Sequence, residues 1–189
     1  MIEIINKIAL NYCSLNKLTI SNWEVNSKII EYRKGEQIVS EGQKRHKLFY
    51  VIKGSLKAYY MNEDKKIIDW FAFGNEFITS STSYFTDEPS LHFIETMEDC
   101  IILETEKNKV EMLCKNNHDF EHLFRLILSK VIVQFRYRVV SIQFKTVKQR
   151  YDSLIKQYPQ IELTVPLGDI ASYLGITQET LSRIRASYS

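Results

Sequence analysis

The stretch IASYLGITQETLSRIR, from Ile170 to Arg185, decides how the C-terminal part of this 189-residue chain folds. Gly175 separates two short helical segments, and glycine readily adopts the positive φ angle that a tight turn requires. Ala171 is small enough to stand where the two helices cross, and Thr177 occupies the expected N-cap of the second helix. The pattern therefore predicts a helix-turn-helix. Its apolar contacts would come from Ile170, Leu174, Ile176, Leu181 and Ile184.

The second helix of this unit would present polar side chains at its N-terminal end, the part of a recognition helix that enters the major groove of DNA. An arginine can bind guanine O6 and N7, and a glutamate can accept from cytosine N4. In the alternative interpretation, Glu179 only interacts favourably with the helix dipole and Arg183 only pairs with it across one turn. That interpretation accounts for two positions of the pattern, whereas a helix-turn-helix accounts for seven. We expect DNA contacts from Thr177, Gln178, Glu179, Ser182 and Arg183.

The charge of the chain is divided unevenly along its length. From Met1 to Phe124 there are 15 basic and 19 acidic residues, whereas Arg125 to Ser189 holds 10 basic and 4 acidic residues. The formal net charge of +2 therefore hides two parts of about −4 and +6. This distribution indicates that only the C-terminal part contacts a polyanion.

Upstream, the stretch from Asp119 to Phe144 is predicted to form one helix of roughly 25 residues. Apolar residues recur along it at four-and-three spacing, interrupted once by Arg138, as in the seam of a coiled coil. The alternative is a core helix of a monomer. We expect two chains to pair along a seam of Phe124, Leu128, Val131, Phe135 and Ile142.

A second apolar face of the same helix is expected to pack on the rest of the chain, through Phe120, Leu123, Ile127 and Val139. A membrane span is excluded because four cationic side chains would lie at hydrocarbon depth, namely Arg125, Lys130, Arg136 and Arg138. The first ten residues lack the uninterrupted apolar run of a signal peptide. We therefore expect a cytoplasmic protein without membrane contact.

Between the long helix and the helix-turn-helix, we expect a helix from Thr146 to Tyr158 and a short strand from Ile161 to Val165. Pro166 would open the next helical segment. We expect no β-hairpin wing after the recognition helix, so phosphate contacts are assigned to Lys145, Lys148 and Arg150.

The N-terminal half reads as short strands separated by turn residues, after a first helix from Ile4 to Leu15. The strands are rich in Tyr, Phe, Val and Ile, and glycines fall between them, as in an antiparallel roll. The predicted strands are Ile29 to Tyr32, Gln37 to Val39, Leu48 to Ile52, Ser55 to Tyr60, Ile67 to Phe73, Leu91 to Thr96 and Cys100 to Glu104.

Together these features resemble the Crp/Fnr superfamily of bacterial transcription regulators over nearly the whole chain. Besides the helix-turn-helix, Tyr32 to Glu36, Glu41-Gly42 and Leu48 to Ser55 resemble strings that cyclic nucleotide-binding domains carry. The resemblance implies an α+β fold: an antiparallel double-stranded β-roll of the cyclic-nucleotide-binding type, a long dimerisation helix and a small α-helical helix-turn-helix domain. It also implies base-reading roles for Gln178, Glu179 and Arg183. The expected domain ranges are 1–118, 119–144 and 145–189.

The stretch from Phe77 to Leu91 departs from the family's nucleotide-binding cassette. Thr79 and Ser80 stand where the resemblance places glycine and glutamate, and Ser90 and Leu91 stand where it places arginine and serine. Without the arginine, phosphate binding should weaken about ten- to hundredfold, so cyclic AMP is not the expected effector. The serines and threonines could bind a different polar ligand or form a solvated loop that binds nothing. The candidate ligand residues are Thr79, Ser80, Ser81 and Ser90.

The sequence carries no recognisable catalytic set, such as a glycine-rich phosphate loop or a nucleophile elbow. Its three cysteines are too few for the family's iron-sulfur sensing, and Asn116-Asn117 should break any shared face of Cys114, His118 and His122. A cupin enzyme would need more histidines than His46 and His92 within its strands. We therefore expect no metal, no certain cofactor and no catalysis.

The predicted function is that of a homodimeric, sequence-specific regulator that binds double-stranded DNA, with an unidentified small-molecule effector in its roll. RNA polymerase is a further candidate partner. The alternative is a constitutive DNA-binding dimer, or a protein-docking module, whose roll binds no small molecule.

Overall fold

Two four-stranded antiparallel sheets form the β-roll of the computed structural model, which describes residues 1–187. One sheet has the strand order β1-β8-β3-β6 and the other the order β2-β7-β4-β5. Side chains that alternate inward from both sheets, among them Phe49, Val51, Leu56, Ile94 and Ile102, form the core between them. The strands are β1 (Ser27–Tyr32), β2 (Gln37–Val39), β3 (Lys47–Lys53), β4 (Ser55–Asn62), β5 (Lys65–Phe73), β6 (Phe77–Ile78), β7 (Phe93–Thr96) and β8 (Cys100–Glu106).

Four helices pack together at one end of the roll: α1 (Ile2–Leu10), α2 (Lys17–Val25), α3 (Lys107–Asn116) and the start of α4 (His118–Phe144). Trp23 of α2 meets Phe120 of α4 edge to face, with ring centroids 5.1 Å apart. As predicted, the chain breaks at Asn117, whose extended backbone (φ −137°) separates α3 from α4. Both helices are thereby packed into one apolar core with the roll.

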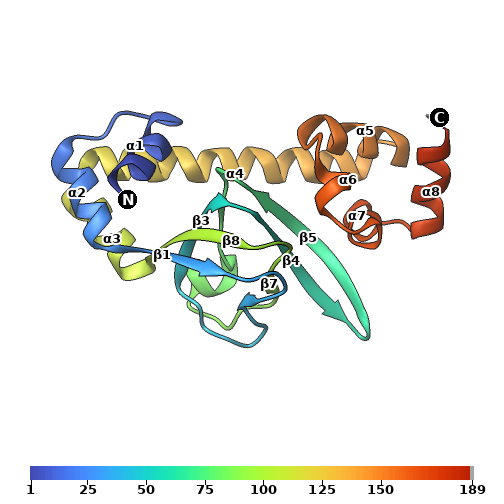
Figure 1. The fold of residues 1–189 in the computed structure, drawn as a ribbon, viewed down its shortest axis with the longest axis horizontal. Helices are drawn as coiled ribbons and strands as arrows, with labels where there is room; N and C mark the ends of the chain where they lie inside the picture. The colour runs from blue at the N-terminus through green and yellow to red at the C-terminus, as the bar shows by residue number, and fades with distance from the viewer. Residues whose placement is uncertain (188–189) are drawn as a thin grey trace.

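Helix α4 runs along the molecule and connects the roll to a small helical head at the opposite end (Figure 1). The head consists of α5 (Val147–Gln157), α6 (Ile161–Thr164), α7 (Leu167–Leu174) and α8 (Gln178–Ala186). Thr146 and Gln149 form a capping box that begins α5 directly after Lys145 ends α4. Among residues 1–187, no helix is both long and apolar enough to cross a membrane.

The predicted α+β fold is confirmed, and α4 begins one residue earlier than expected. The stretch from Ile161 to Val165, predicted as a strand, begins with helix α6 instead. Ile161 and Val165, four residues apart, are both buried in the apolar core of the head, whereas Leu163 between them is 82% exposed. A strand would have turned all three side chains to the same face.

Two further differences concern the N-terminal helices and the sheet. The first helix ends at Leu10 rather than Leu15, and a second helix, α2, follows because the Asn16 side chain accepts from the N–H of Thr19 as its N-cap. The short strand β6 lies inside the stretch that was treated only as a ligand cassette. Val139 was expected to pack on the roll but is 46% exposed, while its neighbour Arg138 packs on the Tyr173 ring of the helical head.

Candidate DNA interface and effector cavity

The turn between α7 and α8 has the conformation that its sequence predicts. Gly175 is left-handed, with φ 69° and ψ 38°, and the N–H of Ile176 donates to the Ala171 carbonyl at 3.0 Å. The Thr177 hydroxyl accepts from the N–H of Thr180 at 3.3 Å and so begins α8. Leu181 is completely buried in the same apolar cluster as Ile170, Ala171 and Leu174. The helix-turn-helix is therefore a packed unit.

The outer face of α8 presents the predicted base-reading residues to solvent. Gln178, Glu179, Ser182 and Arg183 are all exposed, as is the capping residue Thr177. The pKa of Glu179 lies below its usual value, because its own backbone N–H, the Thr177 hydroxyl and the Arg183 guanidinium favour the ionised carboxylate. The helix therefore offers an acceptor and a cation side by side at its exposed N-terminal end.

Two arginines of the head have structural partners instead. Arg185 Nε lies 2.8 Å from Glu162 Oε1, and the Tyr151 hydroxyl donates to the same oxygen at 2.8 Å. Arg150, expected to bind phosphate, donates to the backbone carbonyls of Lys145 and Leu174, each at 3.1 Å. Arg150 thus connects the end of α4 to the end of α7. No signal in the local sequence distinguishes these arginines from Arg183, since their partners come from other helices.

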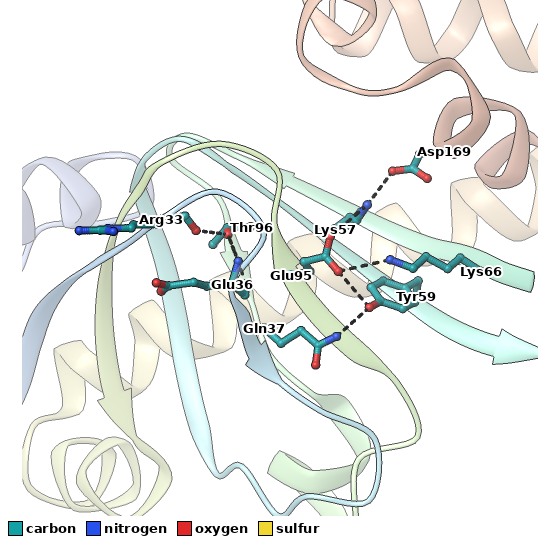
Figure 2. A network of polar contacts seen from close by, with 9 residues as sticks. All are labelled: Arg33, Glu36, Gln37, Lys57, Tyr59, Lys66, Glu95, Thr96 and Asp169. Carbon is teal, nitrogen blue, oxygen red and sulfur yellow. Dashed lines mark hydrogen bonds and ion pairs between the residues drawn. The ribbon is translucent and has the colours of Figure 1, made fainter.

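A polar network joins the head to the roll of the same chain (Figure 2). Lys57 Nζ of β4 lies 2.8 Å from Asp169 Oδ2 of α7 and 3.3 Å from Glu95 Oε1 of β7. Lys57 is only 8% exposed, so solvent screens these ion pairs weakly. On the β5 side, Ser172 accepts from the N–H of Ile68 and donates to the Lys66 carbonyl, both at 2.9 Å.

Apolar contacts reinforce this network. Phe71 of β5 and Tyr173 of α7 have ring centroids 5.1 Å apart, and the Arg138 guanidinium of α4 lies 3.8 Å from the centre of the Tyr173 ring. Helix α7 is therefore docked against the roll, whereas α8 faces away from it at the end of the molecule (Figure 1). This interface leaves no local pattern in the sequence, because Lys57 and Asp169 lie 112 residues apart.

A cavity of about 140 Å³ lies between the roll and α4. Of the four candidate ligand residues, Thr79 and Ser81 line it, whereas Ser80 and Ser90 do not. Ser80 donates to the Ser90 hydroxyl at 2.8 Å, and Ser90 donates to the His92 carbonyl at 2.7 Å, with both serines buried. These two serines therefore hold the cassette together, and Ser80 and Ser90 are not part of a solvated loop.

Some residues of the predicted α4 seam line this cavity, and others are exposed to solvent. Phe124, Leu128 and Val131 line the cavity, and so does Phe135, whose ring centroid lies 4.9 Å from that of Trp70. Ile142, further along, is 56% exposed. The second half of α4 also exposes other large apolar side chains, namely Ile132, Val133, Tyr137, Val139 and Phe144.

Comparison with known proteins gives the class of protein that this fold defines. Residues 29–117 match the cyclic nucleotide-binding domain family. The predicted resemblance to Crp/Fnr regulators holds for the fold: a cyclic nucleotide-binding domain is followed by a helical head, as in a solved regulator of that family.

Individual relatives are distant. Electron transport regulator A of Shewanella oneidensis is 24% identical over 164 residues, which span 80% of this chain but only 65% of that regulator. The structure of FixK2 from Bradyrhizobium japonicum is 18% identical with a TM-score of 0.74, covering 85% of this chain and 83% of that one. A transcriptional regulator of the Crp/Fnr family from Eubacterium rectale is 18% identical with a TM-score of 0.70, covering 92% and 83%.

Proposed function

We propose that the chain is a homodimeric, sequence-specific DNA-binding transcription regulator, with a sensor domain at 1–118, a dimerisation helix at 119–144 and a DNA-binding domain at 145–189. The observation that carries the proposal is the exposed polar face of α8, formed by Thr177, Gln178, Glu179, Ser182 and Arg183 on a packed helix-turn-helix. The expectation that no wing follows concerns the end of the chain beyond Ser187, outside the described residues.

Dimerisation would pair two α4 helices through Phe135 and Ile142, the exposed members of the predicted seam, and the other exposed apolar residues of α4, because large apolar side chains in solvent favour a partner surface. The seam residues Phe124, Leu128 and Val131 line the cavity of their own chain instead. Each dimer would then present two α8 helices to successive major grooves, with half-sites roughly 34–36 Å apart. Double-stranded DNA and a second copy of the chain are the proposed partners, with RNA polymerase as a further one. The relatives named above as regulators support regulation rather than catalysis.

The roll would act as the sensor of an effector other than cyclic AMP. Ser90 occupies the place of the family's arginine, and its hydroxyl is engaged by Ser80 and the His92 carbonyl. No lysine or arginine is among the residues that line the cavity between the roll and α4. A phosphate placed there would therefore lack the cationic partner that its desolvation requires.

Selection of binding sites from random double-stranded DNA with the full chain tests the proposal. We expect enrichment of a pseudo-palindrome whose half-sites are one helical turn apart. The absence of any enriched sequence, with the protein folded, would contradict a role in sequence-specific regulation. Native mass spectrometry of freshly purified protein separates a ligand-sensing dimer, which retains a small molecule, from a constitutive DNA-binding dimer with an empty roll.

A further inference from the structure

The cavity between the roll and α4 has a mainly apolar wall that includes several aromatic rings. Trp70 and Phe85 contribute to it from the roll side, and Phe124, Val131 and Phe135 contribute from α4. Its volume of about 140 Å³ is close to that of an engineered apolar cavity, roughly 150 Å³, that stays dry and accepts a benzene molecule. The space therefore fits a single aromatic ring.

One buried polar side chain in this wall, among the described residues, lacks a hydrogen-bond partner. His92 is only 4% exposed, yet neither of its ring nitrogens has a hydrogen-bond partner among the described residues. The ring packs edge to face against Tyr60, with centroids 5.4 Å apart, and lines the cavity. Burial lowers the pKa of His92, so the imidazole is neutral and offers one donor and one acceptor. A buried polar group without a partner is unfavourable, and a ligand that pairs with it would remove that cost.

The charge around His92 restricts the ligand further. Asp69, which also lines the cavity, is the only charged residue in the lining within residues 1–187, and it would repel an anion. A phosphate or carboxylate is therefore disfavoured, whereas an uncharged hydroxyl can donate to the imidazole.

We propose that this cavity binds a small, uncharged aromatic molecule that carries one hydroxyl group, with its ring against Trp70, Phe124 and Phe135 and its hydroxyl bound to His92. The inference rests on the proposed function, for which it names the chemical class of the effector. Since one wall of the cavity is the proposed dimerisation helix, an occupied cavity would favour one position of α4 over another and so bias the placement of the DNA-binding heads.

Phenol and toluene are suitable probes for the full chain, because they have similar size but only phenol carries a hydroxyl group. Trp70 reports binding through its fluorescence, and the Trp70→Phe variant shows how much signal comes from Trp23, the other tryptophan. We expect saturable binding of both probes, with phenol bound about three- to tenfold more tightly. His92→Phe should retain toluene binding and lose the preference for phenol.

Two further measurements do not depend on the folding of that variant. In the wild-type chain, phenol but not toluene should shift the ¹⁵N resonances of the His92 ring. Val131→Phe should fill the cavity and weaken the binding of both probes at least tenfold, since the larger side chain takes the space of the ligand.

The inference is overturned if neither probe binds saturably to the wild-type chain, if phenol leaves the His92 resonances unchanged, or if folded Val131→Phe binds both probes as before. Site selection on DNA keeps this result apart from the proposed function. If the chain selects a DNA sequence but binds neither probe, only the proposed class of effector is refuted. If the chain selects no sequence, the proposed function as a regulator is refuted.

Discussion

Lys57 of the roll and Asp169 of the helical head form an ion pair, with Nζ 2.8 Å from Oδ2, in an interface that is almost closed to solvent. The lysine lies between two carboxylates, since Glu95 Oε1 is 3.3 Å away on the other side. This pair fixes α7 against the β-roll while the outer face of α8 remains exposed. The head is therefore joined to the roll through contacts within one chain.

Removal of the Asp169 carboxylate is expected to loosen the head without unfolding the roll. In Asp169→Ala, Lys57 keeps Glu95 but loses a charged hydrogen bond, at a cost of about 1.5–3 kcal/mol. Hydrogen exchange should accelerate in α7 and α8 and stay unchanged in β3 and β8. Asp64→Ala, at the exposed turn between β4 and β5, is the control. Equal protection of α7 in both variants would show that the ion pair does not hold the head.

Arg183→Ala is expected to weaken specific DNA binding by about 1–3 kcal/mol and to relax the preference at one base pair in each half-site. The reason is that Arg183 is exposed on α8 next to Glu179, where it can reach a guanine edge. Site selection with the variant measures both effects. Lys156→Ala, which removes one exposed charge from α5 of the same head, should lower affinity without changing the selected sequence. An unchanged sequence preference in Arg183→Ala would exclude it as a base-reading residue.

Ile142→Asp is expected to convert the dimer to a monomer. Ile142 is 56% exposed near the end of α4, and a carboxylate buried there between two helices would have no partner. The Ile142→Asp variant separates an effect on dimerisation from an effect on folding better than Phe135→Asp does, because Phe135 also packs on Trp70 of its own roll. Light scattering gives the mass, and Gln143→Asp on the adjacent exposed position is the control. A dimer that persists in Ile142→Asp would place the interface elsewhere.

Asp119→Asn is expected to destabilise the N-terminal helices in a pH-dependent way. Partial burial alone would raise the pKa of Asp119, but hydrogen bonds from the Asn16 N–H, the Thr19 hydroxyl and the Phe120 N–H outweigh it and hold the pKa below 3.8. A lowered folded-state pKa stabilises the fold above the unfolded value, and this contribution is lost as the pH falls through the folded value.

The measurement is urea unfolding of wild-type and Asp119→Asn protein at pH 7 and at several values from pH 4 downward. We expect a difference in unfolding free energy of about 1.5–3 kcal/mol at pH 7 that shrinks once the pH falls below 3.8. Glu121→Gln, which removes a partly exposed acid in the same turn, should show no such convergence. A constant difference across the whole range would mean that the ionised form of Asp119 is not what ties α2 to α4.

Local pattern was sufficient for much of the fold. Gly175 and Thr177 specify the turn of the helix-turn-helix through their own backbone and capping preferences, so that unit was predictable from the sequence. The roll strands were predictable from apolar runs between turn residues, and α4 from its length without a break. The exposed face of α8 followed from the same periodicity, since burial of Leu181 directs Glu179 and Arg183, two residues before and after it, outward.

Other features came only from contacts between residues far apart in the sequence. The helical turn at Ile161, the bonding of Arg150 to two carbonyls, the Lys57–Asp169 pair and the unpaired His92 all depend on which surfaces meet after folding. Periodicity reports only which side of an element is apolar, and it does not say which neighbour covers that side. The sequence alone therefore determined most of the elements and the exposed polar face of α8, whereas the tertiary structure decided how the head docks and where the cavity lies, because both arise from long-range packing.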